Sequence, residues 1–180
     1  MDPPALYPPV AKAYKRFVGA IGDHDNLSVI TFDSTPNVRF SGDLSTQARR
    51  QTARDALPAT ASGSGTDIGA ALGAVLDRLE SPTSNEVQTV IFLTDGQIYA
   101  PGSPYASTSG KAWDALARRA SRVDEGHRLS VYGAGLGGKA TDVGVLKKVF
   151  PSTQIVGIPA AQLPSFFAQA VQRARVERLY

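Results

Sequence analysis

The sequence predicts an α/β protein, a Rossmann-like three-layer sandwich with a mostly parallel sheet and helices on both of its faces. The first observation is that short β-branched runs alternate along the chain with segments whose apolar residues recur at helical spacing. The second is that such alternation favours right-handed crossovers between parallel strands. The 180 residues, 42% of them hydrophobic, suffice for one core, so we expect a single domain over residues 1–180.

Five runs are expected to form the strands. LSVITF (27–32) and VQTVIFL (87–93) are almost continuously apolar, which is typical of strands buried on both faces. A turn signal follows the first of them, so NVRF (37–40) is expected to return as an antiparallel edge strand. LSVYGAG (129–135) and QIVGI (154–158) complete the sheet.

The helices are expected between these strands. The clearest pattern runs from 67 to 80, where apolar residues follow the i, i+3, i+4, i+7 rule. The other expected helices are 10–21, the segment around Trp113 with that residue in the core, 142–149 and 163–174, and residues 45–57 have modest helical character.

Ligands of open α/β sheets bind beyond the carboxyl ends of the strands. The loops that follow Phe32, Leu93 and Ala134 are therefore where a site is expected. The flexible SGSG loop (62–65), which leads through Thr66 into the clearest helix, belongs to the same edge of the sheet.

Composition excludes several classes of protein. The absence of cysteine excludes a disulfide scaffold, a zinc–thiolate site and cysteine catalysis. No apolar run approaches the roughly 20 residues of a membrane span, and the amino terminus lacks signal-peptide features, so a cytoplasmic location is expected. The net charge of +3 is mild and no aromatic residues interleave with the basic ones, which argues against a nucleic-acid partner. The Ala- and Arg-rich composition suggests a bacterial source.

Three stretches, in this order, resemble the von Willebrand factor type A (VWA) family. HDNLSVITFDSTPNVRF (24–40) resembles the second and third strands of the family. SGSGTDIGAALGAVLDRL (62–79) resembles its Gly-Thr loop and the helix that follows, and VQTVIFLTDGQ (87–97) resembles its fourth strand, which ends in Thr-Asp-Gly. The resemblance covers almost the whole chain, and three ordered matches are more specific than any single one.

The resemblance implies a non-enzymatic protein-interaction domain with a metal-ion-dependent adhesion site. The family's ligands are an Asp-x-Ser-x-Ser motif, a Thr of the Gly-Thr loop and an Asp after the fourth strand; carried over, the last two are Thr66 and Asp95. Such oxygen ligands suit Mg²⁺. A carboxylate of a protein partner commonly completes the shell in the family, so a protein partner is expected at this face.

The sequence departs from the family because the first strand and its Asp-x-Ser-x-Ser motif are absent. Met1 falls where the family motif ends, so we expect an amino-terminally truncated chain. The family strand order places the missing strand between 27–32 and 87–93, which would leave an opening about 10 Å wide. Another chain could donate a strand there, the chain could self-associate through the opening, or the flanking strands could close up and pair.

Other interpretations compete for the same residues. Asp67 is expected to cap the following helix and Asp33 to organise a turn, rather than bind metal. Thr66 and Asp95 could likewise serve only as a cap and a turn residue. The run Gly133-x-Gly135-x-x-Gly138 matches a dinucleotide fingerprint, but no acidic residue follows at the required distance, and a tight turn fits better. The alternatives for function are a nucleotide-binding enzyme that uses this turn, or a structural module that has lost its metal site.

Overall fold

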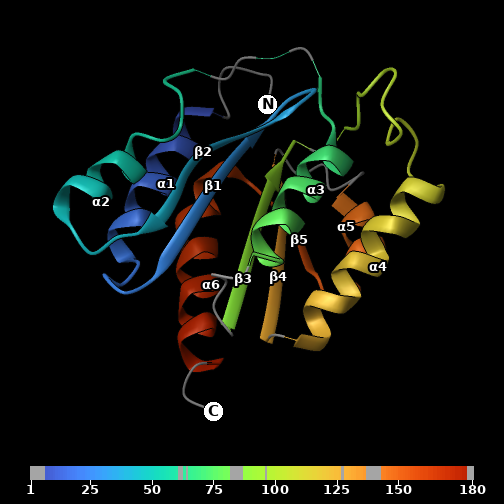
Figure 1. The fold of residues 1–180 in the computed structure, drawn as a ribbon. Coiled ribbons are helices and arrows are strands. Elements are labelled where there is room, and N and C mark those ends of the chain that lie inside the picture. Colours follow the sequence, from blue (N-terminus) through green and yellow to red (C-terminus); the bar gives the residue numbers. More distant parts are fainter. Residues whose placement is uncertain are drawn as a thin grey trace.

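The strands of this protein form two sheets rather than one (Figure 1). In the computed structural model, which describes residues 7–60, 63, 65–81, 87–95, 97–126, 128–136 and 143–177, β1 (Asn26–Phe32) pairs antiparallel with β2 (Pro36–Asp43). The second sheet is parallel, in the order β3 (Val87–Thr94), β4 (Arg128–Leu136) and β5 (Gln154–Ile158). The overall strand sequence is therefore β2-β1, an interruption, and β3-β4-β5.

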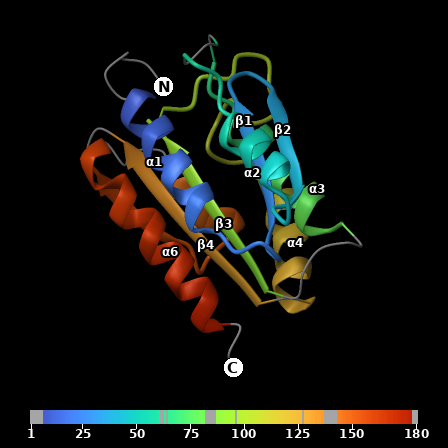
Figure 2. The same ribbon diagram turned by 90° about the vertical axis from the view of Figure 1, so that its left-hand side faces the viewer.

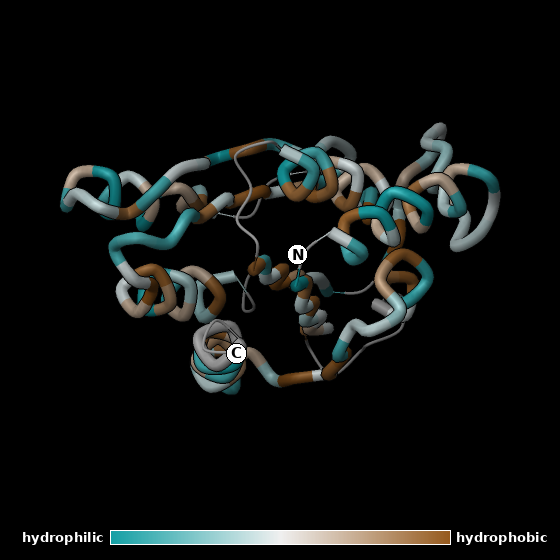
Figure 3. The backbone as a smooth tube through the Cα atoms, turned by 60° about the horizontal axis from the view of Figure 1, so that its bottom comes forward, coloured by the Kyte–Doolittle hydropathy of each residue, from teal (hydrophilic) through white to brown (hydrophobic). Residues whose placement is uncertain are grey.

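Helices cover both faces of these sheets. Figure 2 shows α1 and α6 lying across the face of β3 and β4, while α3, α4 and α5 pack against the opposite face in a separate apolar cluster. Polar and apolar residues alternate along the helices, and they are visible as teal and brown bands in Figure 3. The helices are α1 (Tyr7–Ala20), α2 (Gln47–Arg54), α3 (Ile68–Leu79), α4 (Lys111–Gly126), α5 (Leu146–Val149) and α6 (Leu163–Glu177), with short 3₁₀ turns at Val143–Val145 and Ala160–Gln162.

The predicted elements are confirmed, with boundaries that shift by a few residues. The start of α3 has a local cause, because the Asp67 carboxylate accepts a hydrogen bond of 2.8 Å from the Ala70 N–H. The predicted cap is therefore present. Trp113 lies in the core as expected, 2% exposed, and its indole N–H donates to the Ser107 carbonyl at 2.7 Å. Among the described residues, no helix combines the length and apolarity that crossing a lipid bilayer requires.

The opening expected between the first two apolar strands is confirmed. In the described part of the chain β1 and β3 do not pair, so the alternative in which they close up is not what the structure adopts. Packing of side chains and helices joins the two halves instead. Phe17 of α1 stacks obliquely on Phe167 of α6, with ring centroids 4.8 Å apart, and the Phe32 and Phe92 rings meet at 5.1 Å.

The smaller sheet has a core of its own, formed with α1 and α2. Tyr14, Val18, Val29, Leu44 and Ala53 are its buried members. Arg50 of α2 fastens this unit, since its guanidinium donates to two carbonyls at the end of α1 and to a carboxylate; the acceptors are Val18 O at 2.6 Å, Ile21 O at 2.9 Å and Asp23 Oδ1 at 2.6 Å.

We predict that Arg50→Ala lowers the free energy of unfolding by about 2 kcal/mol, because it leaves partly buried carbonyls without donors. The matched control is Arg49→Ala on the same helix. Arg49 is half-exposed and pairs with Asp43 at the surface, so its loss is expected to cost less than about 1 kcal/mol. Urea unfolding of the two variants measures the difference, and equal costs would contradict this role of Arg50.

A second prediction concerns pH. The Arg119 guanidinium on α4 hydrogen-bonds Glu80 at the end of α3, and this holds the pKa of Glu80 below its usual value of 4.5. A depressed carboxyl pKa contributes stability above the unfolded-state value and loses it as the pH falls through the folded-state value. The stability difference between wild type and Arg119→Met should therefore be larger at pH 7 than at pH 3.

The control for this measurement is Arg118→Met, since Arg118 is an exposed neighbour on the same helix. Its effect on the urea midpoint should be small and the same at both pH values. If the stability difference between wild type and Arg119→Met is the same at both pH values, the ion pair with Glu80 does not contribute to stability.

Candidate functional site

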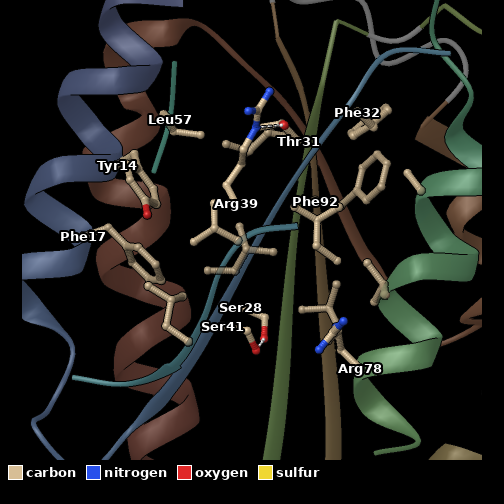
Figure 4. A pocket seen from close by; sticks show the side chains of 18 of the residues that line it. Tyr14, Phe17, Ser28, Thr31, Phe32, Arg39, Ser41, Leu57, Arg78 and Phe92 are labelled. Atoms are coloured by element: carbon tan, nitrogen blue, oxygen red, sulfur yellow. Dashed lines mark hydrogen bonds between the residues drawn. The ribbon is translucent and has the colours of Figure 1, made fainter. Parts of the chain in front are cut away.

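A groove of about 650 Å³ separates β1 from β3. Its two long walls are the facing edges of these strands. Residues of α1 and α6 close one face and residues of α3 close the other, so the groove runs the length of the interruption in the sheet (Figure 4). It therefore occupies the place at which the sequence predicts a missing strand.

Apolar side chains line most of this groove. Tyr14 and Phe17 project from α1, and Phe32 and Phe92 close the groove from the side of α3 (Figure 4). The Tyr14 hydroxyl donates to the Ala53 carbonyl at 2.5 Å, and burial raises the pKa of this phenol well above its ordinary value. Tyr14 is therefore a neutral, fixed part of the wall at any ordinary pH.

Polar groups lie along the groove at a few separated points. Ser28 and Ser41 share a hydrogen bond of 3.0 Å, and the Arg39 Nε donates to the Thr31 hydroxyl at 2.9 Å (Figure 4). Gln88 of β3 is only 7% exposed; its amide nitrogen donates to the Leu79 carbonyl at 3.2 Å, but its Oε1 has no hydrogen-bond partner among the described residues. A buried acceptor without a hydrogen-bond donor lowers the free energy of unfolding by about 1–3 kcal/mol.

The carboxyl ends of β1 and β3 meet the Gly-Thr loop at one end of the groove. The Thr66 N–H donates to the Tyr99 carbonyl at 2.7 Å and the Tyr99 N–H returns a bond of 3.1 Å to the Thr66 carbonyl. On the other side, the Asp67 N–H donates to the Asp33 carbonyl at 2.7 Å. Backbone bonds thus hold Thr66 between the turn after β1 and the loop after β3.

Two glycines permit close approaches near the start of α3, one to the turn after β1 and one to the Tyr105 ring. Gly63 has φ of +124°, and a Cβ there would lie 2.4 Å from the Cβ of Asp33. Gly69, in the first turn of α3, faces the Tyr105 ring so closely that a Cβ would lie 2.0 Å from it. The sequence suggests flexibility for the SGSG loop, whereas the structure uses its described glycines for packing; Ser62 and Ser64 lie outside the described residues.

The two predicted ligands, Thr66 and Asp95, both line this groove. A hydroxyl and a carboxylate suit a hard cation, which in the case of Mg²⁺ takes six oxygen ligands. The described residues contain no cluster of three or more His, Cys, Asp or Glu side chains able to hold a metal ion. Thr66 and Asp95 by themselves supply two oxygen groups, so the cation site implied by the family resemblance stays a prediction.

The neighbouring carboxylates serve the structural roles expected of them. Asp67 caps α3, and the Asp33 carboxylate accepts from the Thr35 N–H at 2.9 Å within the turn after β1. Gly133 and Gly135 lie inside β4, paired with Ile155 and Gly157 of β5. The strand predicted over 129–135 is therefore confirmed for these two glycines, and the tight turn predicted for the Gly133-x-Gly135-x-x-Gly138 run does not include them; Gly138 lies outside the described residues.

Sequence reasoning missed Tyr99, Tyr105 and Gln88. Tyr99 is 63% exposed and contributes its backbone to the Thr66 bridge, so its side chain gives no signal of this role. Gly69 within a strong helical pattern could have signalled a close approach such as that of Tyr105. Gln88 is the one amide residue of β3, and this could have signalled a buried polar contact such as its bond to the Leu79 carbonyl.

Comparison with solved structures finds the same fold in proteins of very different sequence. A von Willebrand factor type A protein from Catenulispora acidiphila is 18% identical with a TM-score of 0.66, over 92% of this chain and 37% of that chain. The pilus adhesin SpaC from Lactobacillus rhamnosus GG is 15% identical with a TM-score of 0.65, over 93% of this chain and 28% of that one.

A third neighbour is proximal thread matrix protein 1 from the mussel byssus, solved with a zinc-occupied MIDAS motif. It is 16% identical with a TM-score of 0.61, over 92% of this chain and 42% of that one. The chain thus spans less than half the length of each of these three proteins. No curated protein matches it by sequence.

A sequence model of the von Willebrand factor type A domain matches residues 7–97, just over half of the chain. The matched region contains β1, β2, the Gly-Thr loop, α3 and β3, which are the elements that build the groove and its carboxyl end. The chain belongs to the von Willebrand factor type A domain family.

Proposed function

We propose that this chain is a non-enzymatic protein-interaction domain that receives its partner at the carboxyl ends of β1 and β3. A divalent cation, held on this chain by Thr66 and Asp95, contributes to that surface. The proposal includes a single domain over residues 1–180, a cytoplasmic location and Mg²⁺ as the cation. It also includes a partner strand, or a second copy, at the opening between β1 and β3.

One observation carries the proposal: Thr66 and Asp95 come from separate segments of the chain and line the same groove. The backbone bridge to Tyr99 and the bond from Asp67 to Asp33 fix the Thr66 loop without using its hydroxyl. The backbone bonds that fix the loop leave the Thr66 hydroxyl out, and this hydroxyl and the Asp95 carboxylate are oxygen groups of the kind that a divalent cation binds. When bound, such a cation would attract a carboxylate oxygen of a partner.

The choice of Mg²⁺ rests on ligand chemistry. The proposed ligands are oxygen atoms only, and the chain has no cysteine to supply the softer ligands that favour zinc. One structural neighbour has zinc in its MIDAS motif, so zinc serves as a comparison in the titration. The nucleotide-binding alternative loses support, because Gly133 and Gly135 lie in a paired strand instead of a phosphate-binding turn.

The test is calorimetric titration with Mg²⁺, Mn²⁺ and Zn²⁺. The chain by itself should bind weakly or not at all, because Thr66 and Asp95 supply too few ligands. A fusion that adds an apolar strand ending in Asp-x-Ser-x-Ser before residue 1 should bind, and Asp95→Ala or Thr66→Ala in this fusion should weaken binding at least tenfold, about 1.4 kcal/mol.

The control in the fusion is Asp114→Ala, which removes an exposed carboxylate from the first turn of α4, and it should leave the affinity unchanged. A fusion that binds no divalent cation, or whose binding survives Asp95→Ala, would overturn the metal assignment. A partner complex that forms equally well in a chelator would favour the structural module with a lost metal site.

A further inference from the structure

We propose that the outer edge of β5 is a second interaction surface, which takes up an extended acidic segment of a protein partner as an added antiparallel strand. This edge lies at the far margin of the parallel sheet, with β4 and β3 between it and the groove. The inference therefore goes beyond the proposed function, and it requires neither the cation nor an occupant of the groove.

The outer side of β5 has no backbone partner among the described residues. β4 pairs with β5 on one side, and no described strand, loop or helix forms a backbone hydrogen bond to the other side. Alternate residues of a strand direct their N–H and C=O groups to the same side, so two or three of the five residues of β5 present these groups outward. Such a row of donors and acceptors is a template for pairing with an extended segment.

The outer edge of the smaller sheet, formed by β2, is protected against such pairing, whereas the edge of β5 is not. β2 begins at Pro36, which has no N–H, and it carries the charged residues Arg39 and Asp43. The β1–β2 ladder also has a bulge, between Val29 and Ile30. These features are typical of edges that avoid other chains. β5, with the sequence QIVGI, has no charged residue, no proline and an unbroken register, and only its length of five residues limits pairing.

The side chains of β5 that face α6 show what an added strand would contact. Ile158 packs in the apolar cluster that includes residues of α6, so Val156 and Gln154, which precede it at two-residue intervals, lie on the same face. Helix α6 lies mainly across β3 and β4 (Figure 2), and Val156 is left 38% exposed. A strand added beside β5 would place an apolar side chain next to Val156, and removing this surface from water favours binding.

Arg173 of α6 supplies a positioned positive charge beside the amino end of β5. Its guanidinium donates a hydrogen bond to Gln154 Oε1 and lies over the Tyr132 ring, with 5.9 Å between the guanidinium carbon and the ring centroid. Among the described residues it has no carboxylate partner. A carboxylate of the added strand next to Gln154 would therefore form a charge-assisted hydrogen bond with a guanidinium that is already oriented.

The sequence around β5 has the same sign of charge. Residues 128–173, which include β4, α5, β5 and most of α6, contain one acidic residue, Asp142, and five basic ones, which are Arg128, Lys139, Lys147, Lys148 and Arg173. This charge attracts an acidic segment and repels a second copy of the same edge. Two copies joined through β5 would also pair only five residues each, too few for the roughly 1,200–2,000 Å² of a stable interface.

These contacts define the direction and the sequence of the added strand. An antiparallel ladder is slightly more stable per residue than a parallel one, and antiparallel strands commonly close the margin of a parallel sheet. In this direction the residues that lie beside Ile158, Val156 and Gln154 follow one another at two-residue intervals. We therefore expect the order apolar-x-apolar-x-acidic, with β-branched residues at the apolar positions.

The binding experiment uses the 180-residue chain and the fluorescein-labelled peptide SITVTES, which has this order. Fluorescence anisotropy should show saturable binding. A control peptide with N-methyl groups on its third and fourth residues should bind roughly tenfold more weakly or worse, because adjacent N–H groups point to opposite sides of a strand and one of the two must face β5. Absence of binding, or equal binding of the two peptides, would overturn strand addition.

A charge swap tests where the acidic residue lies. Arg173→Glu should weaken binding of SITVTES roughly tenfold or more and should strengthen binding of SITVTKS, in which the charge is reversed. The matched control is Arg118→Glu, which reverses an exposed charge on α4 and should leave both affinities unchanged at physiological ionic strength, where distant charges are screened. An Arg173→Glu variant that behaves like the control would overturn the placement of the acidic residue.

Hydrogen exchange and light scattering test the edge and its occupant. Amides of 154–158 should exchange more slowly when SITVTES binds, and those of β2 should not. Slowing in β2 instead of β5 would overturn the choice of edge. The free chain should scatter light as a monomer, and dimers that Val156→Lys abolishes would show that β5 pairs with itself, which would overturn the partner segment.

This experiment and the cation titration fail independently. Asp95→Ala should bind SITVTES as the wild type does, because Asp95 follows β3, two strands away from β5. Peptide binding by a chain whose fusion ignores divalent cations would keep the β5 surface and remove the metal assignment. A fusion that binds Mg²⁺, in a chain without affinity for SITVTES, would keep the metal assignment and remove the β5 surface.

Discussion

The structure depends on how two half-sheets are held at a fixed separation without hydrogen bonds between β1 and β3. α1 does much of this, because its residues belong both to the core of the β1–β2 unit and to the cluster that covers β3 and β4. The Phe17–Phe167 and Phe32–Phe92 contacts brace the two faces of the same opening. Side-chain packing is less directional than a ladder of hydrogen bonds, so the two halves can remain in register while the space between them stays open.

The loops that carry Thr66 are stabilised by contacts of their own, and not by whatever occupies the groove. The loops at the carboxyl end are joined by their own backbone bonds, between Thr66 and Tyr99 and between Asp67 and Asp33. Glycines allow these loops to pack at short range. Thr66 is therefore positioned before any strand or cation arrives, which reduces the ordering entropy that binding has to overcome.

The helices and strands could be predicted because their hydrophobic periods are strong, and the Asp67 cap because a carboxylate directly precedes an apolar helical pattern. The opening could be predicted only through the family resemblance, since no pattern within LSVITF or VQTVIFL signals an absent neighbour. Gly133 and Gly135 were assigned both to the strand 129–135 and to a glycine-rich turn, and pairing with β3 and β5, a tertiary effect, selects the strand. Tyr99, Gln88 and the Phe32–Phe92 contact depend on which segments meet in space, and local sequence does not contain that information.

In the proposed function, strand binding and cation binding are coupled by geometry. A strand parallel to β1 and β3 brings its carboxyl end beside Thr66 and Asp95, so any oxygen ligand it carries there adds to the partial site on this chain. By linkage, a strand that raises the affinity for the cation is itself bound more tightly in its presence, by the same factor. A strand without such ligands would occupy the groove through its backbone alone and show no dependence on the cation. Under the proposed function, a partner strand with oxygen ligands at its carboxyl end would be recognised together with metal, and one without them would be recognised independently of it.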